Sequence, residues 1–117
     1  MAESVLRDKS RAFAREVVFL CRRLKQAGVE FALINQLLRC GTSIGANVHE
    51  AKYAQSTKDF ISKFEIALKE CNECEYWLEL LIESGIVRED GLAELLKETN
   101  EIVAMTVASI KTLRART

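Results

Sequence analysis

Apolar residues recur along this chain in alternating steps of four and three positions, the spacing that keeps one face of an α-helix against a neighbour. The pattern divides the sequence into four segments, approximately residues 4–27, 31–54, 57–84 and 89–113. A helix of about 24 residues would be about 36 Å long. The pattern therefore predicts an all-α protein built from four long helices.

The same steps predict which side chains face the core. In the first segment they are Leu6, Ser10, Phe13, Val17, Leu20, Leu24 and Ala27. In the second segment they are Ile34, Leu37, Leu38, Gly41, Ile44, Gly45, Val48 and Ala51. In the third segment they are Phe60, Phe64, Ala67, Cys71, Cys74, Leu78 and Leu81. In the fourth segment they are Leu92, Leu96, Thr99, Val103, Thr106, Ile110 and Leu113.

Local signals mark the helix ends. Gly28 before Val29, and Gly85 before Ile86, predict Schellman stops, in which the glycine is left-handed and the next apolar residue folds back. Ser56, three residues before an acidic residue, predicts an N-cap with a variant capping box. Arg88 is a poor N-cap for the fourth helix.

Composition and connection lengths favour one simple topology. The 117 residues include no proline and only five glycines, and they suffice for a single domain over 1–117. Because the three links are short, sequential helices should pack antiparallel. We expect an up-down-up-down four-helix bundle.

Two glycines interrupt the second helix. Gly41 and Gly45 lie four residues apart on one face, and each costs the helix about 1 kcal/mol relative to alanine. A close approach by another helix would explain both.

Charge is balanced overall but not locally. The chain has 17 basic and 17 acidic residues, while residues 1–28 carry seven basic and three acidic side chains and residues 56–84 carry three and seven. In an antiparallel bundle the start of the first helix lies beside the end of the fourth, so we expect a basic end that could contact RNA or another nucleic acid. Its cations would be Arg7, Lys9, Arg11, Lys111, Arg114 and Arg116.

The sequence carries no signal for export or a membrane. The N-terminus is charged where a signal peptide is apolar, and no run reaches the roughly 18 apolar residues of a membrane span. We expect a cytoplasmic protein without a membrane partner, whose four cysteines are thiols rather than disulfides.

Candidate chemistry is sparse. Cys71 and Cys74 form half of a zinc-type motif that Cys21, Cys40 or His49 could complete, but both lie on the predicted core face, where cysteine behaves as a small apolar residue. His49, the only histidine, is interpreted as a structural or surface residue. No phosphate loop, nucleophile elbow or paired-histidine motif occurs. We therefore expect no enzyme, no cofactor and no bound metal.

A polar stripe is the most specific constellation. On the second helix it comprises Arg39, Ser43, Asn47 and Glu50, and on the third Asp59, Lys63, Glu70 and Glu73 beside Phe60. Either these groups pair with each other between helices or subunits, or they form a small polar site for a small ligand or metal.

Apolar residues also fall outside the predicted core stripes. Ile66, Trp77 and Leu80 lie beside the stripe of the third helix, and Val18 and Phe19 beside that of the first. A monomer would leave this surface exposed, so we expect a homo-oligomer, and two different faces per subunit would close a ring.

Ordered motifs carry a resemblance that spans essentially the whole chain. They are Gln36 and Arg39; Ser43, Ile44 and Asn47; Glu50 and Ala51; Ser56, Asp59 and Phe60; Ile66, Ala67 and Glu70; and Tyr76, Trp77 and Leu78. In order and spacing they resemble the four-helix-bundle proteins encoded by intervening sequences in bacterial 23S ribosomal RNA genes. Cys40 and Gly41 depart from the small Ser or Ala residues usual there.

The resemblance implies a homopentameric ring of bundles without enzymatic activity, in a family of unknown function. It also implies kinship with the accessory protein of diversity-generating retroelements, a bundle that engages nucleic acid and a reverse transcriptase. Those nucleic-acid-binding relatives are markedly basic, whereas this chain is neutral overall.

Overall fold

The computed structural model describes residues 2–116, which form four α-helices and no strand. The helices are α1 (Ala2–Gln26), α2 (Phe31–Ala51), α3 (Thr57–Glu83) and α4 (Glu89–Ala115). The predicted all-α class with four long helices is confirmed.

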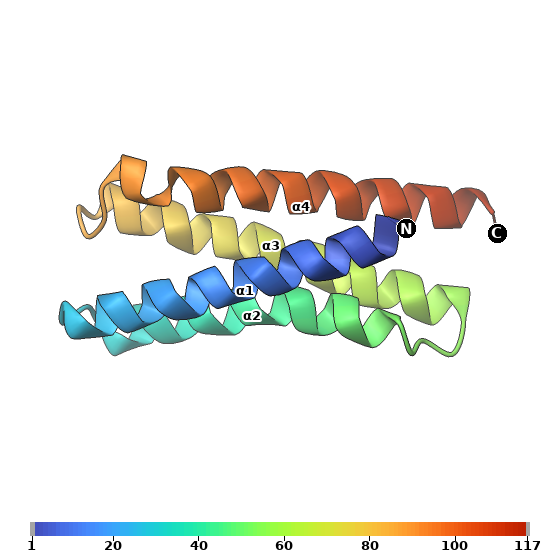
Figure 1. Cartoon of the computed structure of the whole chain (residues 1–117), viewed down its shortest axis with the longest axis horizontal. Coiled ribbons are helices and arrows are strands. Elements are labelled where there is room, and N and C mark those ends of the chain that lie inside the picture. The colour runs from blue at the N-terminus through green and yellow to red at the C-terminus, as the bar shows by residue number, and fades with distance from the viewer. Residues whose placement is uncertain (1, 117) are drawn as a thin grey trace.

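The four helices lie side by side in an elongated molecule of 48 × 22 × 19 Å, and the chain reverses direction at each connection (Figure 1). Contacts join α1 to α2, α2 to α3, α3 to α4 and α4 to α1. Because α1 and α3 make no such contact, they occupy diagonal positions. The solvent-facing sides of α1 and α3 therefore point in different directions.

Both glycine stops form as the sequence predicts. Gly28 has φ 78° and Gly85 has φ 73°, a left-handed conformation that glycine adopts without strain. The Val29 amide donates to the Leu24 carbonyl at 3.1 Å, and the Ile86 amide to the Leu81 carbonyl at 3.0 Å. These bonds satisfy carbonyls that the helix ends would otherwise leave open.

The start of α3 also matches its sequence signal. The Ser56 hydroxyl accepts a hydrogen bond from the Asp59 amide at 3.0 Å, and the Asp59 carboxylate accepts one from the Gln55 amide at 3.2 Å. Arg88 makes no side-chain cap at the start of α4. Helix α2 ends at Ala51, before the expected residue 54, because residues 52–54 form tighter bonds to carbonyls three positions back.

The core follows the predicted stripes only in part. Ala27 is exposed after the end of α1, Leu38 and Phe60 are half-buried, and Cys21 and Cys40 are buried although the predicted stripes omit them.

The largest differences occur in α4, where the expected Leu113 is half-buried. Leu95 and Ile102 are buried there, whereas the expected Leu96 and Val103 are only half-buried. From Leu92 the buried positions of α4 therefore continue with a step of three residues and then one of four, whereas the sequence predicted four and then three.

Three buried hydroxyls fit this core because each bonds within its own helix. Ser10 donates to the Arg7 carbonyl at 3.2 Å, and Thr99 and Thr106 donate to carbonyls three or four residues earlier at 2.7 Å. Such bonds to the preceding turn satisfy a hydroxyl without a partner from another helix.

At the two glycines of α2, helix α1 comes close to the α2 backbone. A Cβ on Gly45 would lie 3.2 Å from the Ser10 carbonyl oxygen, and one on Gly41 would lie 2.7 Å from a methyl of Val17. The sequence-based interpretation of both glycines as close-approach positions is confirmed.

The four cysteines are free and buried, which confirms the predicted core positions of Cys71 and Cys74, whereas Cys21 and Cys40 lie outside the predicted stripes. Burial raises the pKa of the Cys21 thiol to about 11 and that of Cys71 to about 12. A hydrogen bond with Cys40, together with burial, raises the pKa of the Cys74 thiol. Because thiolate is the reactive form, these residues act as inert packing groups.

Candidate functional site

The cations predicted for one basic end lie on several sides of the bundle. Lys9 pairs with Glu101 of α4, its Nζ 3.0 Å from Oε1, and Arg114 of α4 pairs with Glu65 of α3. Lys111 and Arg116 are exposed near the end of α4, and Arg116 lines a pocket beside Glu3 of α1. The start of α1 thus lies beside the end of α4, but neighbouring acids partner part of the expected patch.

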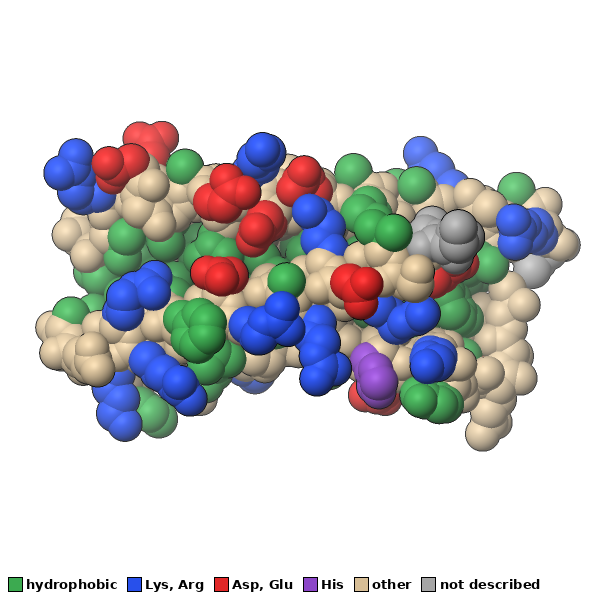
Figure 2. Space-filling view, viewed as in Figure 1, with side chains coloured by type: hydrophobic (Ala, Val, Ile, Leu, Met, Phe, Trp, Pro, Cys, Tyr) green, Lys and Arg blue, Asp and Glu red, His purple; other side chains and the backbone are tan. Residues whose placement is uncertain are grey.

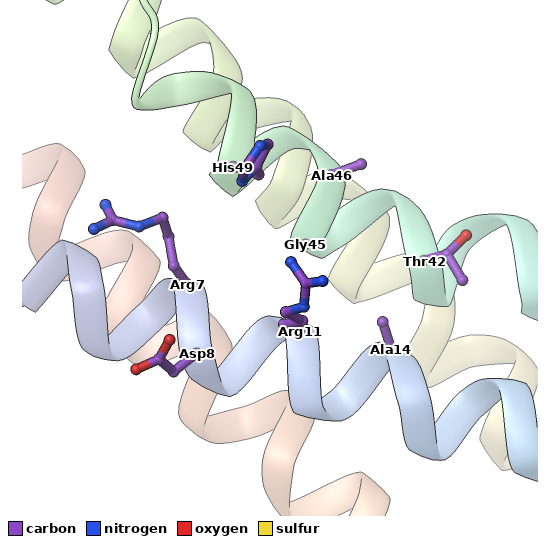
Figure 3. A pocket seen from close by; sticks show the side chains of 8 residues that line it. All are labelled: Arg7, Asp8, Arg11, Ala14, Thr42, Gly45, Ala46 and His49. Atoms are coloured by element: carbon purple, nitrogen blue, oxygen red, sulfur yellow. The ribbon is translucent and has the colours of Figure 1, made fainter.

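Arg7 and Arg11 instead face α2. They line a pocket of about 380 Å³ between α1 and α2, together with Asp8, Ala14, Thr42, Gly45, Ala46 and His49. In Figure 3 the guanidinium group of Arg11 extends from α1 towards Gly45 of α2, whereas the Arg7 side chain leaves α1 on the same side and its guanidinium turns away from His49. Figure 2 shows the histidine beside a band of Lys and Arg side chains along α1, with acidic side chains gathered on the α4 side.

Sequence reasoning did not find this pocket. Its signals are the spacing of four residues between Arg7 and Arg11, and the same spacing between Gly45 and His49, which put each pair on one helix face. The sequence did not show that these two faces meet. His49 is a surface residue, as expected, but it lies at a concave site.

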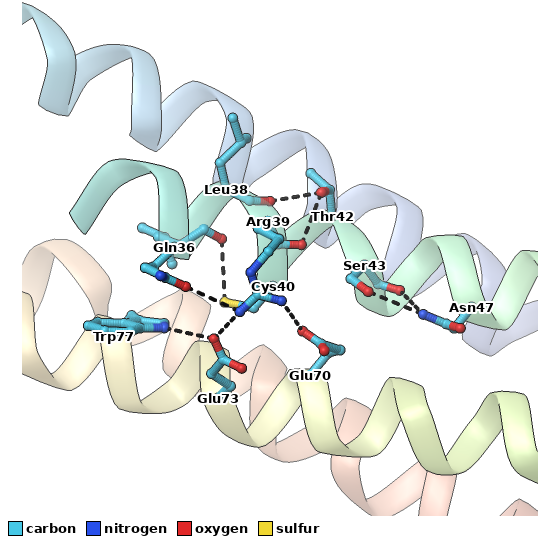
Figure 4. Close-up of polar contacts among 11 residues, drawn as sticks. Gln36, Leu38, Arg39, Cys40, Thr42, Ser43, Asn47, Glu70, Glu73 and Trp77 are labelled. Atoms are coloured by element: carbon cyan, nitrogen blue, oxygen red, sulfur yellow. Dashed lines mark hydrogen bonds and ion pairs between the residues drawn. The ribbon is translucent and has the colours of Figure 1, made fainter. Parts of the chain in front are cut away.

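The polar stripe brings Arg39 of α2 against two carboxylates of α3 (Figure 4). Its guanidinium donates to Glu70 at 3.1 Å and also to Glu73. Glu73 in turn accepts from the indole nitrogen of Trp77 at 3.1 Å, and Gln36 accepts from Arg39 at 3.3 Å. Half of the Arg39 side chain remains exposed, 48%, so this network lies at the surface.

The other stripe residues form separate contacts. Asn47 donates to the carbonyl and the hydroxyl of Ser43, at 2.9 and 3.2 Å, within α2. Glu50 accepts from Lys63 of α3 at 3.3 Å.

The two remaining stripe residues lie at the start of α3. Asp59 serves the N-terminal cap of the helix. Phe60 is half-buried and packs on Phe64, with ring centroids 4.6 Å apart. The stripe is therefore a set of contacts within and between α2 and α3, and residues 2–116 contain no cluster of three or more His, Cys, Asp or Glu suited to a metal ion.

Large apolar side chains remain exposed on α1 and α3, and also at Phe31 and Tyr53 at the two ends of α2. Phe19 on α1 is 47% exposed and Ile66 on α3 is 40% exposed. Val18, Trp77 and Leu80 are half-buried. The exposed Tyr76 contacts the ring of Trp77 edge to face, with centroids 5.0 Å apart.

Comparison with known proteins assigns the family. Residues 3–108 match the family model of the 23S rRNA-intervening sequence protein. The chain belongs to this family. The resemblance carried by the motifs from Gln36 to Leu78 is thereby confirmed. No curated protein shows significant sequence similarity to the chain.

A solved structure agrees with this assignment. The chain is similar to a protein with unknown function from the S23 ribosomal protein family of Bacteroides thetaiotaomicron, with 45% identity and a TM-score of 0.92. The match covers 95% of this chain and 99% of the other. None of the described helices is long and apolar enough to cross a membrane.

Proposed function

We propose that this protein is a non-enzymatic, cytoplasmic scaffold that assembles into a homo-oligomeric ring and contacts RNA. The main support for self-assembly is that Phe19 and Ile66 are exposed on helices at diagonal positions. Apolar surface of this kind favours burial in an interface. Two unlike faces on different sides of one subunit suit a head-to-tail contact, which closes into a ring when the rotation permits.

The face around Ile66 has the composition of an interface. It joins an exposed aliphatic residue, the partly exposed ring of Trp77 and the surface guanidinium of Arg39, and tryptophan and arginine are enriched at the centres of interfaces. The Arg39 network would then fix the orientation of a neighbouring subunit. A pentamer is the ring size that the family resemblance implies.

Two features support RNA as the further partner. The family is defined by proteins of intervening sequences in ribosomal RNA genes, and the matching structure comes from a family described as ribosomal. The chain also concentrates basic side chains along α1 (Figure 2). A ring would repeat this basic surface around its axis, so several weak phosphate contacts would act together.

A single charge on the proposed interface tests the assembly. We expect Ile66→Glu to lower the native mass in light scattering after size exclusion, because a carboxylate buried between subunits would be unpaired. Tyr53→Glu is the matched control: Tyr53 is 68% exposed in the turn after α2, outside both faces. Equal masses for Ile66→Glu and the wild type, with both folded by circular dichroism, would contradict the proposed face.

A further inference from the structure

The pocket between α1 and α2 is a concave site lined by two arginines. Close contact of the Gly45 position with the Ser10 backbone holds the two helices together at this point. Arg7 and Arg11 extend over the junction from α1, and His49 extends from α2 (Figure 3). The pocket of about 380 Å³ has room for a phosphate group and part of the molecule that carries it.

Carboxylates of the described chain do not neutralise these arginines. Neither Arg7 nor Arg11 forms an ion pair within residues 2–116, whereas Arg39, Arg88 and Arg114 each pair with a carboxylate. The carboxylate of Asp8, although it belongs to the pocket lining, points away from α2 in Figure 3.

Two further acids of these helices interact with other helices. Glu50 pairs with Lys63 of α3, and Glu16 is close enough to Glu98 of α4 to affect its titration. The pocket lining therefore carries two arginines against one carboxylate, Asp8, a net positive charge.

The spacing of the arginines along α1 does not stabilise the helix. Like charges four residues apart destabilise a helix, and Arg7, Arg11 and Arg15 form two such pairs. Arg22 continues the series two turns further along α1. A row that extends beyond the pocket suits an extended polyanion better than a single small anion.

We propose that the groove between α1 and α2 binds the phosphate backbone of an RNA strand, with Arg7 and Arg11 as the ligands of one phosphate and Arg15 and Arg22 along its continuation. Guanidinium groups bind phosphate oxygens in bidentate, charge-assisted contacts. His49 contributes a ring N–H from the opposite wall of the groove. The inference rests on the proposed RNA contact. It places that contact on the α1–α2 side of the bundle rather than at its end.

The test measures binding of a fluorescein-labelled single-stranded RNA of about 20 nucleotides to the full chain, by anisotropy across a salt series. The groove variant is Arg7→Gln/Arg11→Gln, and the matched control is Lys111→Gln/Arg116→Gln, which removes the same charge from the end of α4. We expect the groove variant to lose at least about tenfold in affinity at low salt. Its salt slope should fall by about 0.7, since Arg7 and Arg11 together contact one phosphate and each phosphate contact on a single strand contributes about 0.7.

A charge-preserving variant separates binding from folding. Arg7→Lys/Arg11→Lys should keep most of the salt slope but lose affinity, because lysine cannot make the bidentate contact. The native mass of all variants should match the wild type, and the groove variants should unfold at no lower temperature than the wild type. If the wild type binds RNA but the groove and control variants lose equal affinity, the groove is not the binding site. The proposed RNA contact would still stand.

Two other results would contradict the RNA proposals more broadly. If the wild-type protein does not bind RNA at low salt, both the groove and the proposed RNA contact fail, although the assembly proposal stands. If inorganic phosphate binds saturably in calorimetry and the RNA does not bind, the site takes a small anion, and the backbone proposal is wrong.

Discussion

Glu98 on α4 has one carboxylate oxygen, Oε2, that is buried without a hydrogen-bond partner in the described part of the chain. Burial raises the pKa of the Glu98 carboxyl above its usual range, and the nearby Glu94 carboxylate raises it further. A carboxyl whose pKa is higher in the folded state than in the unfolded state binds its proton more tightly when folded. Folding stability must therefore fall as pH rises through the interval between the two pKa values.

Glu98→Gln should consequently raise the melting temperature at pH 7.5. The difference from the wild type should disappear at about pH 4 and below, where the carboxyl is protonated in both states. Thermal unfolding at both pH values provides the measurement, with Glu79→Gln, an exposed acid on α3, as the control. An equal difference at both pH values would show that packing, not ionisation, distinguishes the two side chains.

At the scale of the helices, the approach of α1 to α2 depends on the lack of a side chain at Gly45. We expect Gly45→Leu to lower the free energy of unfolding by about 1–3 kcal/mol or more, because the new side chain would press on the Ser10 backbone. Chemical denaturation measures this change. Ala46→Leu, at the exposed neighbouring position, should change stability by less than about 0.5 kcal/mol. Unchanged stability of Gly45→Leu would mean that the helices can separate at no cost.

Helix boundaries that rest on local chemistry could be predicted from the sequence. Gly28, Gly85 and Ser56 act through their own turns, so neighbouring residues contain the whole signal. The end of α2 could not be fixed, because alanine, lysine and tyrosine at residues 51–53 permit either helix or turn.

The rotation of α4 about its axis also could not be predicted from the sequence. Leu95 and Leu96 are adjacent leucines, and Ile102 and Val103 are adjacent β-branched residues, so both alternatives are equally apolar. Packing against α1 and α3 selects Leu95 and Ile102. The same limit explains the candidate site: sequence places Arg7 and His49 on helix faces but cannot tell which faces meet.

At the scale of the whole molecule, the bundle leaves apolar and charged surface that its own contacts do not use. Phe19 and Ile66 are exposed on diagonal helices, the Arg39 network lies at the surface beside Ile66, and the cations of α1 face a groove. An assembly scaffold accounts for the first two features and an RNA contact for the third. The buried thiols and the self-contained polar stripe fit a structural role.

The native mass of the wild-type protein tests the central claim of self-assembly most directly. Light scattering coupled to size exclusion, over a series of micromolar concentrations, should give a single species of several times the 13.2 kDa chain mass, and five chains if the ring is a pentamer. A mass of 13.2 kDa at every concentration would contradict the account.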